Sequence, residues 1–175
     1  MDQLPAAIQD AISSHTAYEL PDATYASLTT TKLDSIVTAS ALSNDEASYI
    51  FTLEVRAPML SAATDDSVGD AIESGWFETY ARRVEDVTMS TRESIELDSL
   101  VVENENGTAV VQITIQYDHP ERGLELLKTF AEFVEGTYLE GIVPGYSYKS
   151  PVADLLSSAR KTAGSEDEDR GPMPL

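Results

Sequence analysis

The residues that could perform acid–base or nucleophilic chemistry are few in this chain. His15 and His119 are the only imidazoles, one directly after an expected first helix and the other beside Pro120. Ser158 precedes Lys161 with the Ser-x-x-Lys spacing of an acylating serine, but the Lys-Thr-Gly and Ser-Asp-Asn sequences that complete such a site are absent. No Gly-x-Ser-x-Gly nucleophile elbow occurs either. We therefore assign no catalytic residue and favour a protein that is not an enzyme.

The residue types and their spacing do not indicate a metal or cofactor site. Cysteine is absent, which excludes disulfides, thiolate nucleophiles, cysteine-ligated iron–sulfur clusters and zinc fingers. Asp65, Asp66 and Asp70 lack the alternating carboxylates and terminal Glu of a calcium loop, and a helix start explains them more simply. The glycines between 136 and 145 do not have the spacing of a phosphate-binding loop. The sequence predicts neither a metal nor a cofactor.

The segment best suited to binding is 135–148, where three glycines and three tyrosines connect two expected helices. In a functional interpretation the tyrosines form the rim of a groove for a ligand or a peptide, because tyrosine offers a rigid surface with a polar tip. In a structural interpretation Gly136 or Gly141 ends a helix in the left-handed conformation, and the tyrosines cover the edge of a sheet. We favour the structural interpretation. The candidate groove residues are Tyr138, Tyr146 and Tyr148.

The adjacent aromatic residues Trp76 and Phe77 form a second candidate surface. Neighbouring positions on a helix point to different sides, so both side chains cannot easily face one core. We expect one of the two to be partly exposed. If that residue is Phe77, it marks a possible interface with a protein partner or a second copy of the chain. An alanine substitution there that leaves the mass in solution unchanged would count against the interface.

The charge of the chain excludes several classes of partner. Asp and Glu number 31 against 11 Lys and Arg, which gives a formal net charge of -20. Nucleic-acid binding depends on clustered Lys and Arg, and no basic stripe is present. An anionic membrane surface is disfavoured for the same reason. We predict no contact with nucleic acid or membrane.

The same negative charge predicts that the protein works at a high concentration of salt. At about 1 M ionic strength the Debye length is roughly 3 Å, so surface carboxylates stop repelling one another. The evenly spread carboxylates, with abundant Ala, Ser and Thr and little Lys, resemble the composition of proteins from salt-in haloarchaea. We predict a halophilic protein that needs a high concentration of salt and loses structure in dilute buffer. Without a signal peptide or a membrane-spanning run, its expected location is cytoplasmic.

The periodicity of the apolar residues predicts an α+β fold. The order is α-β-β-β-α-β-β-α with an extra C-terminal helix, around an antiparallel sheet of about five strands. Whether 24–42 forms one bent strand or a hairpin stays open. A single domain is expected over 1–162, followed by an acidic disordered tail at 163–175. The second helix has an apolar stripe at every fourth residue, which predicts core packing for Val68, Ile72, Trp76, Tyr80 and Val84. The expected elements are a helix over 4–12 capped by Asp2, strands at 24–31, 35–42 and 48–56, a helix over 66–87, strands at 95–102 and 110–117 joined at Asn106-Gly107, a helix from the cap Asp118 to Tyr138, and a helix opening at Pro151.

Four segments together resemble a haloarchaeal family of unknown function. They are Gly75–Tyr80 with Arg82-Arg83, Phe133–Tyr138, Gly141–Tyr146 and Pro151–Leu156. The resemblance covers most of the chain and implies no activity, cofactor or catalytic residue. The element order is also similar to that of type III secretion chaperones and YbjN-like domains, by analogy only.

Those chaperone and YbjN-like modules bind protein chains, often as dimers. The analogy therefore implies a protein-interaction or chaperone-like binding module, with a protein partner or a homodimer. The alternative is a small-molecule-binding protein or an unrecognised enzyme, with its site near Tyr138–Tyr148.

Overall fold

The computed structural model describes residues 2–42 and 45–169, which form a six-stranded antiparallel sheet covered on one face by helices. The strand order is β1-β2-β3-β4-β6-β5. The strands are β1 (Tyr18–Asp22), β2 (Tyr25–Leu28), β3 (Asp34–Leu42), β4 (Asp45–Pro58), β5 (Ser99–Glu105) and β6 (Thr108–Tyr117). The helices are α1 (Ala6–Ser13), α2 (Asp70–Val84), α3 (Pro120–Glu140) and α4 (Val152–Asp169), with short 3-10 turns at Leu60–Ala62 and Glu85–Ser90. The predicted α+β class and order are confirmed.

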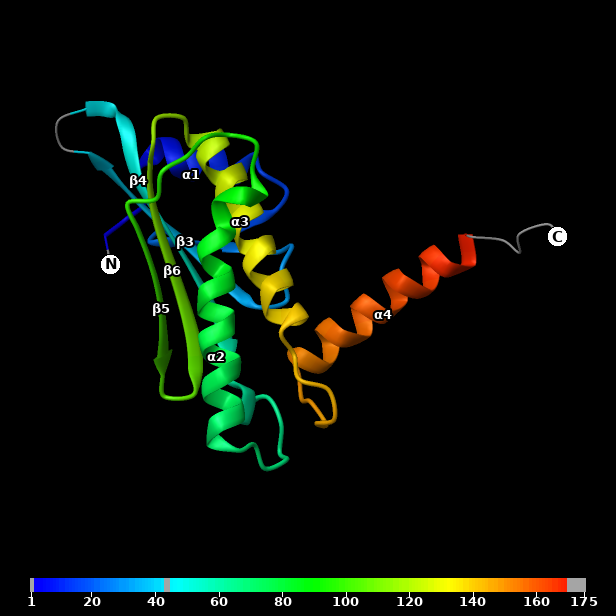
Figure 1. Cartoon of the computed structure of the whole chain (residues 1–175). Helices are drawn as coiled ribbons and strands as arrows, with labels where there is room; N and C mark the ends of the chain where they lie inside the picture. The colour runs from blue at the N-terminus through cyan, green and yellow to red at the C-terminus, as the bar shows by residue number, and fades with distance from the viewer. Residues whose placement is uncertain (1, 43–44, 170–175) are drawn as a thin grey trace.

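The layers follow from the alternation of side chains along β4. Phe51, Leu53 and Val55 are fully buried, whereas Glu54 and Arg56 between and after them are half-exposed on the opposite face. In Figure 1, α1, α2 and α3 lie together on one side of the sheet. Because successive residues of a strand point to opposite faces, β4 places its apolar side chains under these helices and its polar ones toward solvent.

The Thr-rich region 24–42 forms a hairpin and not one bent strand. β2 pairs antiparallel with β3, with Ala26 opposite Val37 and Ser27 opposite Ile36. A further strand, β1, pairs with β2 across a turn in which the Asp22 carboxylate accepts hydrogen bonds from the backbone N–H and the hydroxyl of Thr24, at 2.9 and 2.8 Å. The sheet therefore has six strands, where about five were predicted.

The Asn106-Gly107 hairpin is confirmed. Asn106 has φ 51° and Gly107 has φ 91°, the pair of positive angles that a type I′ turn requires. The turn joins β5 to β6, and both strands run into it without a break. A residue with a β-branched side chain would be strained at Gly107.

The two predicted helix caps, Asp2 and Asp118, are wrong. α1 begins at Ala6 with Pro5 at its N-cap, and not behind Asp2. α3 begins at Pro120 with His119 at the N-cap, while the Asp118 carboxylate accepts a hydrogen bond from the Ser48 hydroxyl at 2.8 Å. Asp118 therefore ties the start of α3 to β4.

The second helix is shorter than predicted. α2 begins at Asp70, because Asp66 lies in the loop before it and accepts a hydrogen bond from the Ser147 backbone N–H at 2.7 Å. The helix gives way to a 3-10 turn after Val84. A contact between segments far apart in the sequence thus sets where this helix starts.

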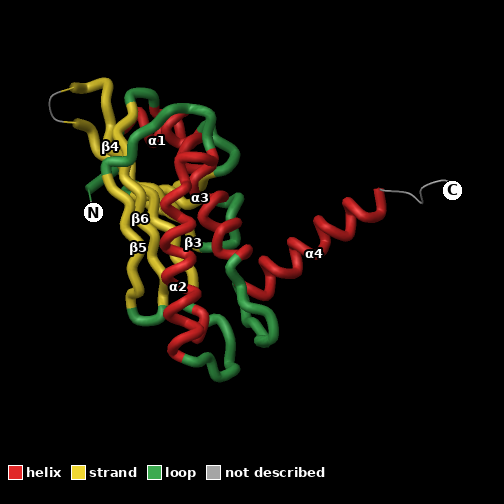
Figure 2. Tube along the Cα trace, in the orientation of Figure 1, coloured by secondary structure: helices red, strands yellow, loops and turns green. Residues whose placement is uncertain are grey.

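The last helix points away from the rest of the molecule. Figure 2 shows α4 extending from the end of the loop that follows α3. Val152 and Leu155 near its start are buried in the core. The backbone of α4 continues to Asp169, inside the range 163–175 that the sequence assigned to a tail. The domain limit at 162 stays a prediction, and residues 170–175 lie outside the described part. Among the described residues, no helix is long and apolar enough to cross a membrane.

Candidate functional site

An aromatic cluster occupies the region where α2 meets the C-terminal half of α3. Trp76 and Tyr80 lie one turn apart on α2, and their rings stack with centroids 5.7 Å apart and an interplanar angle of 6°. Tyr138 of α3 meets both rings edge-on, at 5.6 and 5.7 Å. The spacing of four residues puts Trp76 and Tyr80 on the same face of α2, which makes this stack possible.

A cavity of about 380 Å³ lies beside this cluster, between α2 and the end of α3. Apolar, aromatic and charged side chains all contribute to its walls. The lining residues are Ala71, Ile72, Gly75, Trp76, Thr79, Tyr80, Arg83, Thr137, Glu140, Gly141 and Val143. Its volume falls within the range of roughly 300–1,000 Å³ that small-molecule sites occupy.

Two polar atoms of the aromatic cluster are fully buried without a partner, so they do not open into the cavity. Trp76 and Tyr80 expose only 6% and 2% of their surface, and neither Trp76 Nε1 nor Tyr80 Oη has a hydrogen-bond partner among the described residues. Tyr138 differs, because its hydroxyl donates to the Pro58 carbonyl at 2.8 Å. A buried donor without an acceptor costs about 1–3 kcal/mol, and native proteins contain few of them. These two groups therefore call for an explanation.

The electrostatics of the cavity come from one arginine and one glutamate. Arg83 lines the wall and makes no ion pair with any described residue, although the chain carries a net charge of -20. Glu140 lines the same wall from the end of α3, and these two side chains are not within ion-pair distance of each other. Burial raises the pKa of the Tyr80 hydroxyl, so that group stays protonated and able to donate at neutral pH.

Of the candidate residues predicted from the sequence, one lines this cavity and the others lie around it. Trp76 lines the cavity, and Tyr138 packs behind the stacked rings. Phe77 is half-buried, packs against the core and lies 6.5 Å from the Trp76 ring, outside the lining. Tyr146 and Tyr148 are half-buried too, and their rings meet edge-on at 6.3 Å.

Tyr148 helps to shape the loop that closes one side of the cavity. Its hydroxyl donates to the Val143 carbonyl, and its backbone bridges to Thr64. The Thr64 hydroxyl donates to the Ser147 carbonyl at 2.6 Å, and the Lys149 backbone N–H donates to the Ala63 carbonyl at 2.8 Å. These contacts hold the loop after α3 against the loop before α2.

The expected left-handed end of α3 is wrong. Gly141 does follow the last residue of the helix, but its φ is -86°. The positive φ of this region lies at Gly145, with φ 101°. The Gly141 backbone N–H continues the helical pattern instead, donating to the Thr137 and Tyr138 carbonyls, each at 3.2 Å.

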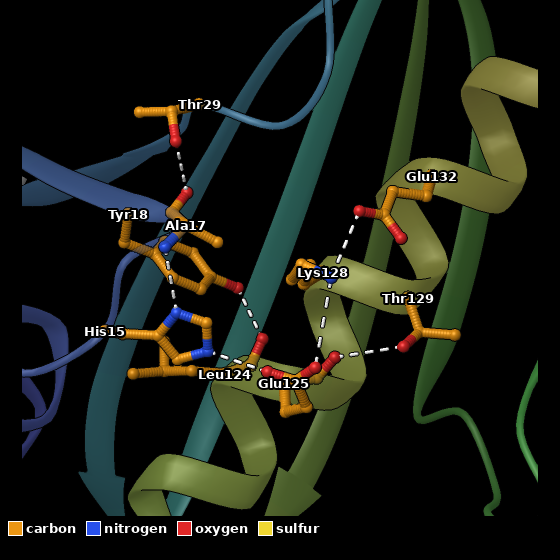
Figure 3. Close-up of polar contacts among 9 residues, drawn as sticks. All are labelled: His15, Ala17, Tyr18, Thr29, Leu124, Glu125, Lys128, Thr129 and Glu132. Carbon is orange, nitrogen blue, oxygen red and sulfur yellow. Dashed lines mark hydrogen bonds and ion pairs between the residues drawn. The ribbon is translucent and has the colours of Figure 1, made fainter.

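The opposite end of α3 carries a second polar cluster, shown in Figure 3. The Ala17 backbone N–H donates to His15 Nδ1 at 3.1 Å, so the proton lies on Nε2, which donates to Glu125 at 2.7 Å. The Tyr18 hydroxyl donates to the Leu124 carbonyl at 2.5 Å. Lys128 also pairs with Glu125, at 3.9 Å. His15 Nε2 thus attaches the segment after α1 to α3, while Nδ1 accepts a hydrogen bond within that segment.

The three aspartates near α2 do not form a metal site. Asp65 pairs with Lys149 at 3.1 Å, Asp66 accepts from Ser147, and Asp70 lies in the first turn of α2. Within the described ranges, no group of three or more His, Cys, Asp or Glu residues is placed to hold a metal ion.

The sequence analysis did not identify Tyr80, Arg83 and Glu140 as candidate residues. Trp76, Tyr80 and Arg83 follow one another at intervals of four and three residues, which marks one face of a helix. That spacing was visible in the sequence, but it was interpreted as core packing. Glu140 had no such signal, because only the packing of α3 on α2 brings it to the cavity.

Comparison with known proteins gives one family. Its sequence profile matches residues 13–158, and it is described as a family of unknown function (DUF5813). No curated protein and no solved structure matches the chain. The matched range contains every residue that lines the cavity. The expected membership of an uncharacterised family is confirmed.

Proposed function

The chain belongs to the family of unknown function DUF5813, and we propose that this domain binds a small molecule in the cavity between α2 and α3. The observation that carries the proposal is the cavity itself, about 380 Å³ in volume and walled by apolar, aromatic and charged side chains. Arg83 in its wall makes no ion pair with any described residue, so its charge is available to a ligand.

Packing alone does not account for these residue types. Phenylalanine at position 80 would supply nearly the same stacked ring without a buried hydroxyl. The cavity also combines an apolar wall with a few convergent polar groups, which is the usual composition of a ligand site. The composition of the wall therefore supports a binding role.

The test uses the tryptophan itself as the reporter. Trp76 is the single tryptophan of the chain, so its fluorescence reports this cavity alone. We expect a subset of a chemically mixed fragment collection to change that emission in a saturable manner. A collection that leaves the emission unchanged throughout would contradict the proposal.

A matched pair of variants tests whether the fragments bind in the cavity. Ile72→Ala removes an exposed aliphatic side chain from the cavity wall, and we expect it to weaken the binding of the fragments that bind the original protein. Val101→Ala removes an exposed aliphatic side chain from β5, outside the cavity lining, and should leave their affinity unchanged. Equal affinities for the original protein and Ile72→Ala would place the fragments elsewhere.

A protein-interaction role is the second candidate, and one feature of the sheet favours it. β5 forms an outer edge, and its Val101 side chain is 39% exposed. An edge strand presents unpaired backbone groups that a second copy of the chain could pair with. We expect such a homodimer to show as a doubled mass in solution. A monomeric mass at high protein concentration would remove this candidate.

The proposal also covers the salt concentration, because with a net charge of -20 the acidic side chains repel one another in dilute buffer. We propose that the domain works in concentrated salt. Circular dichroism across a KCl titration should show structure lost as the salt falls well below about 1 M, where the Debye length grows from roughly 3 Å to 10 Å. A spectrum that does not change with salt would contradict a halophilic protein.

A further inference from the structure

We propose that two copies of this chain associate through the face of the sheet that lies opposite the helices. In Figure 1, α1, α2 and α3 lie on one side of the sheet, and the strands present their other side to solvent. We call the centre of that side the open face. The strand register places its residues side by side: Ile36, Thr38 and Ser40 of β3, Ile50, Thr52 and Glu54 of β4, Gln112, Thr114 and Gln116 of β6, and Ser99 of β5. This inference goes beyond the proposed function and does not depend on it.

The open face presents no free carboxylate, although the chain carries 31 acids. Glu54 is its one ionisable residue, and both carboxylate oxygens of Glu54 have partners. Arg56 donates to Oε1 at 2.9 Å and Gln112 donates to Oε2 at 3.0 Å. Removing a free carboxylate from water costs several kcal/mol, and salt does not screen that cost because it is a loss of hydration. The open face can therefore be covered without that penalty.

A row of hydroxyls crosses the open face and makes it complementary to itself. The row consists of Thr38, Thr52, Thr114 and Ser99, which are paired in register on four neighbouring strands. Hydroxyls and side-chain amides both donate and accept hydrogen bonds, whereas a carboxylate only accepts. In a two-fold dimer the same surface patch meets itself. A face of hydroxyls and amides can form hydrogen bonds in that arrangement, and a face of carboxylates cannot.

Two isoleucines add apolar surface to the open face. Ile36 and Ile50 are half-buried, and neither belongs to the core cluster under the helices. Covering apolar surface stabilises an interface by about 25 cal/mol per Å². This contribution does not depend on charges, so concentrated salt does not screen it.

These features favour a second copy over a partner of another class. A cationic partner would bind where free carboxylates gather, and the open face offers none. A second copy carries the same net charge of -20, so the positions without free carboxylates are where it can approach with the least loss of hydration. The contact also differs from pairing through the edge of β5, because β4 and β6 separate β3 from that edge.

Sedimentation equilibrium of the full chain measures the association, at one KCl concentration that keeps the protein folded by circular dichroism. We expect twice the mass of one chain at high protein concentration and a return to a single chain on dilution. A mass that stays at one chain up to the highest concentration would overturn the inference.

The same substitution at two threonines provides the matched control. Thr38→Lys puts an ammonium group into the open face, and Thr16→Lys makes the same change in an exposed turn after α1. Each variant lowers the net negative charge by one, so neither increases the repulsion between copies. We expect Thr38→Lys to raise the dissociation constant of the dimer about tenfold or more, because it buries an unpaired charge, and Thr16→Lys to leave it unchanged. An unchanged constant in Thr38→Lys, or an equal increase in both variants, would overturn the assignment of the open face.

A second pair of variants keeps the test decisive if Thr38→Lys fails to fold. Gln116→Glu keeps the shape of an exposed side chain of the open face and adds only a carboxylate, while Gln3→Glu makes the same change at an exposed residue before α1. We expect the dimer to weaken in Gln116→Glu alone. Equal weakening in both variants would show a general effect of charge and contradict the inference.

The mass in solution and the emission of Trp76 are separate readouts. A monomer whose emission changes with fragments would refute the dimer and leave the proposed small-molecule function standing. A dimer that loses its stability in Thr38→Lys, with an emission that no fragment changes, would do the reverse.

Discussion

The two ends of α3 differ in how their polar side chains are bonded. Near its start, the Tyr18 hydroxyl, the His15 ring and the Glu125 carboxylate all have partners (Figure 3). Near its end, the buried atoms Trp76 Nε1 and Tyr80 Oη have none among the described residues. A satisfied group stabilises the packing that it joins, whereas an unsatisfied buried one destabilises it. We infer that the first end of the helix is an attachment, and that the second gives up stability beside the proposed binding site.

The largest expected effect is a loss of stability at high pH, and it comes from both ends. Burial raises the pKa of the Tyr18, Tyr80 and Tyr138 hydroxyls above the usual value of about 10. Above that value the unfolded chain loses protons that the folded chain keeps, so the stability present below pH 10 falls as the pH rises. Each tyrosine contributes a slope of up to roughly 1.4 kcal/mol per pH unit.

Urea denaturation at a series of alkaline pH values measures this slope. Tyr80→Phe should show a shallower decline than the original protein, because one of the three groups is gone. Parallel curves for the two proteins would mean that Tyr80 ionises alike in the folded and unfolded states, and would contradict its burial.

The next effect compares the same substitution at two positions of α3. A Cβ at Gly123 would lie 2.8 Å from the fully buried Phe51 ring, so Gly123→Ala should destabilise the domain by about 1–3 kcal/mol. A Cβ at Gly136 meets nothing within 4 Å, and Gly136→Ala should stabilise the helix by about 0.5–1 kcal/mol. Chemical denaturation measures both. Equal effects would show that α3 does not approach β4 as closely as described.

A pair of tyrosine variants tests the contrast between the two ends directly. Tyr18→Phe removes a hydroxyl that donates to the Leu124 carbonyl and should cost about 1 kcal/mol. Tyr80→Phe removes a hydroxyl without a partner and should leave stability unchanged or raise it by up to about 1 kcal/mol. Thermal unfolding at neutral pH separates the two. A clear destabilisation by Tyr80→Phe would reveal a partner for that hydroxyl.

The smallest effect belongs to the exposed ion pairs of the first end. Lys128 and Glu132 lie one turn apart on α3 with their charged atoms 3.2 Å apart. Glu132→Gln should cost only about 0.3–0.5 kcal/mol, and less in concentrated salt, because such pairs are screened. Denaturation at two KCl concentrations checks this. A cost above about 1 kcal/mol that persists at high salt would indicate a more buried network.

Local patterns carried most of the fold prediction. The alternation along β4, the apolar stripes of α2 and α3 and the Asn106-Gly107 turn were all assigned from residues close together in the chain. The misplaced starts of α1, α2 and α3 have another origin. Asp118 and Asp66 are ordinary capping residues by local rules, but Ser48 and Ser147 bind them instead. Both partners lie about 70 or more residues away, beyond the reach of a local rule.

The candidate site was predicted less completely. Trp76 and Tyr138 were named for their residue types, and both belong to the aromatic cluster. Tyr80 was assigned to the core by its spacing, which is correct for its ring and says nothing of its hydroxyl. The exposed fraction of a ring follows from helical periodicity, but the partner of a polar atom depends on the neighbouring element. For that reason, Arg83 and Glu140 emerged only when α2 was packed against α3.

The amino-acid sequence by itself determined the α+β class, the order of helices and strands, the acidic surface and the tight turn between β5 and β6. Each of these depends on periodicity, composition or backbone preference within a few residues. Only the tertiary structure decided which buried polar groups find a partner and which side chains line the cavity. Hydrogen bonds require atoms to meet within about 3 Å, and segments distant in the chain reach that separation only through the packing of the whole domain.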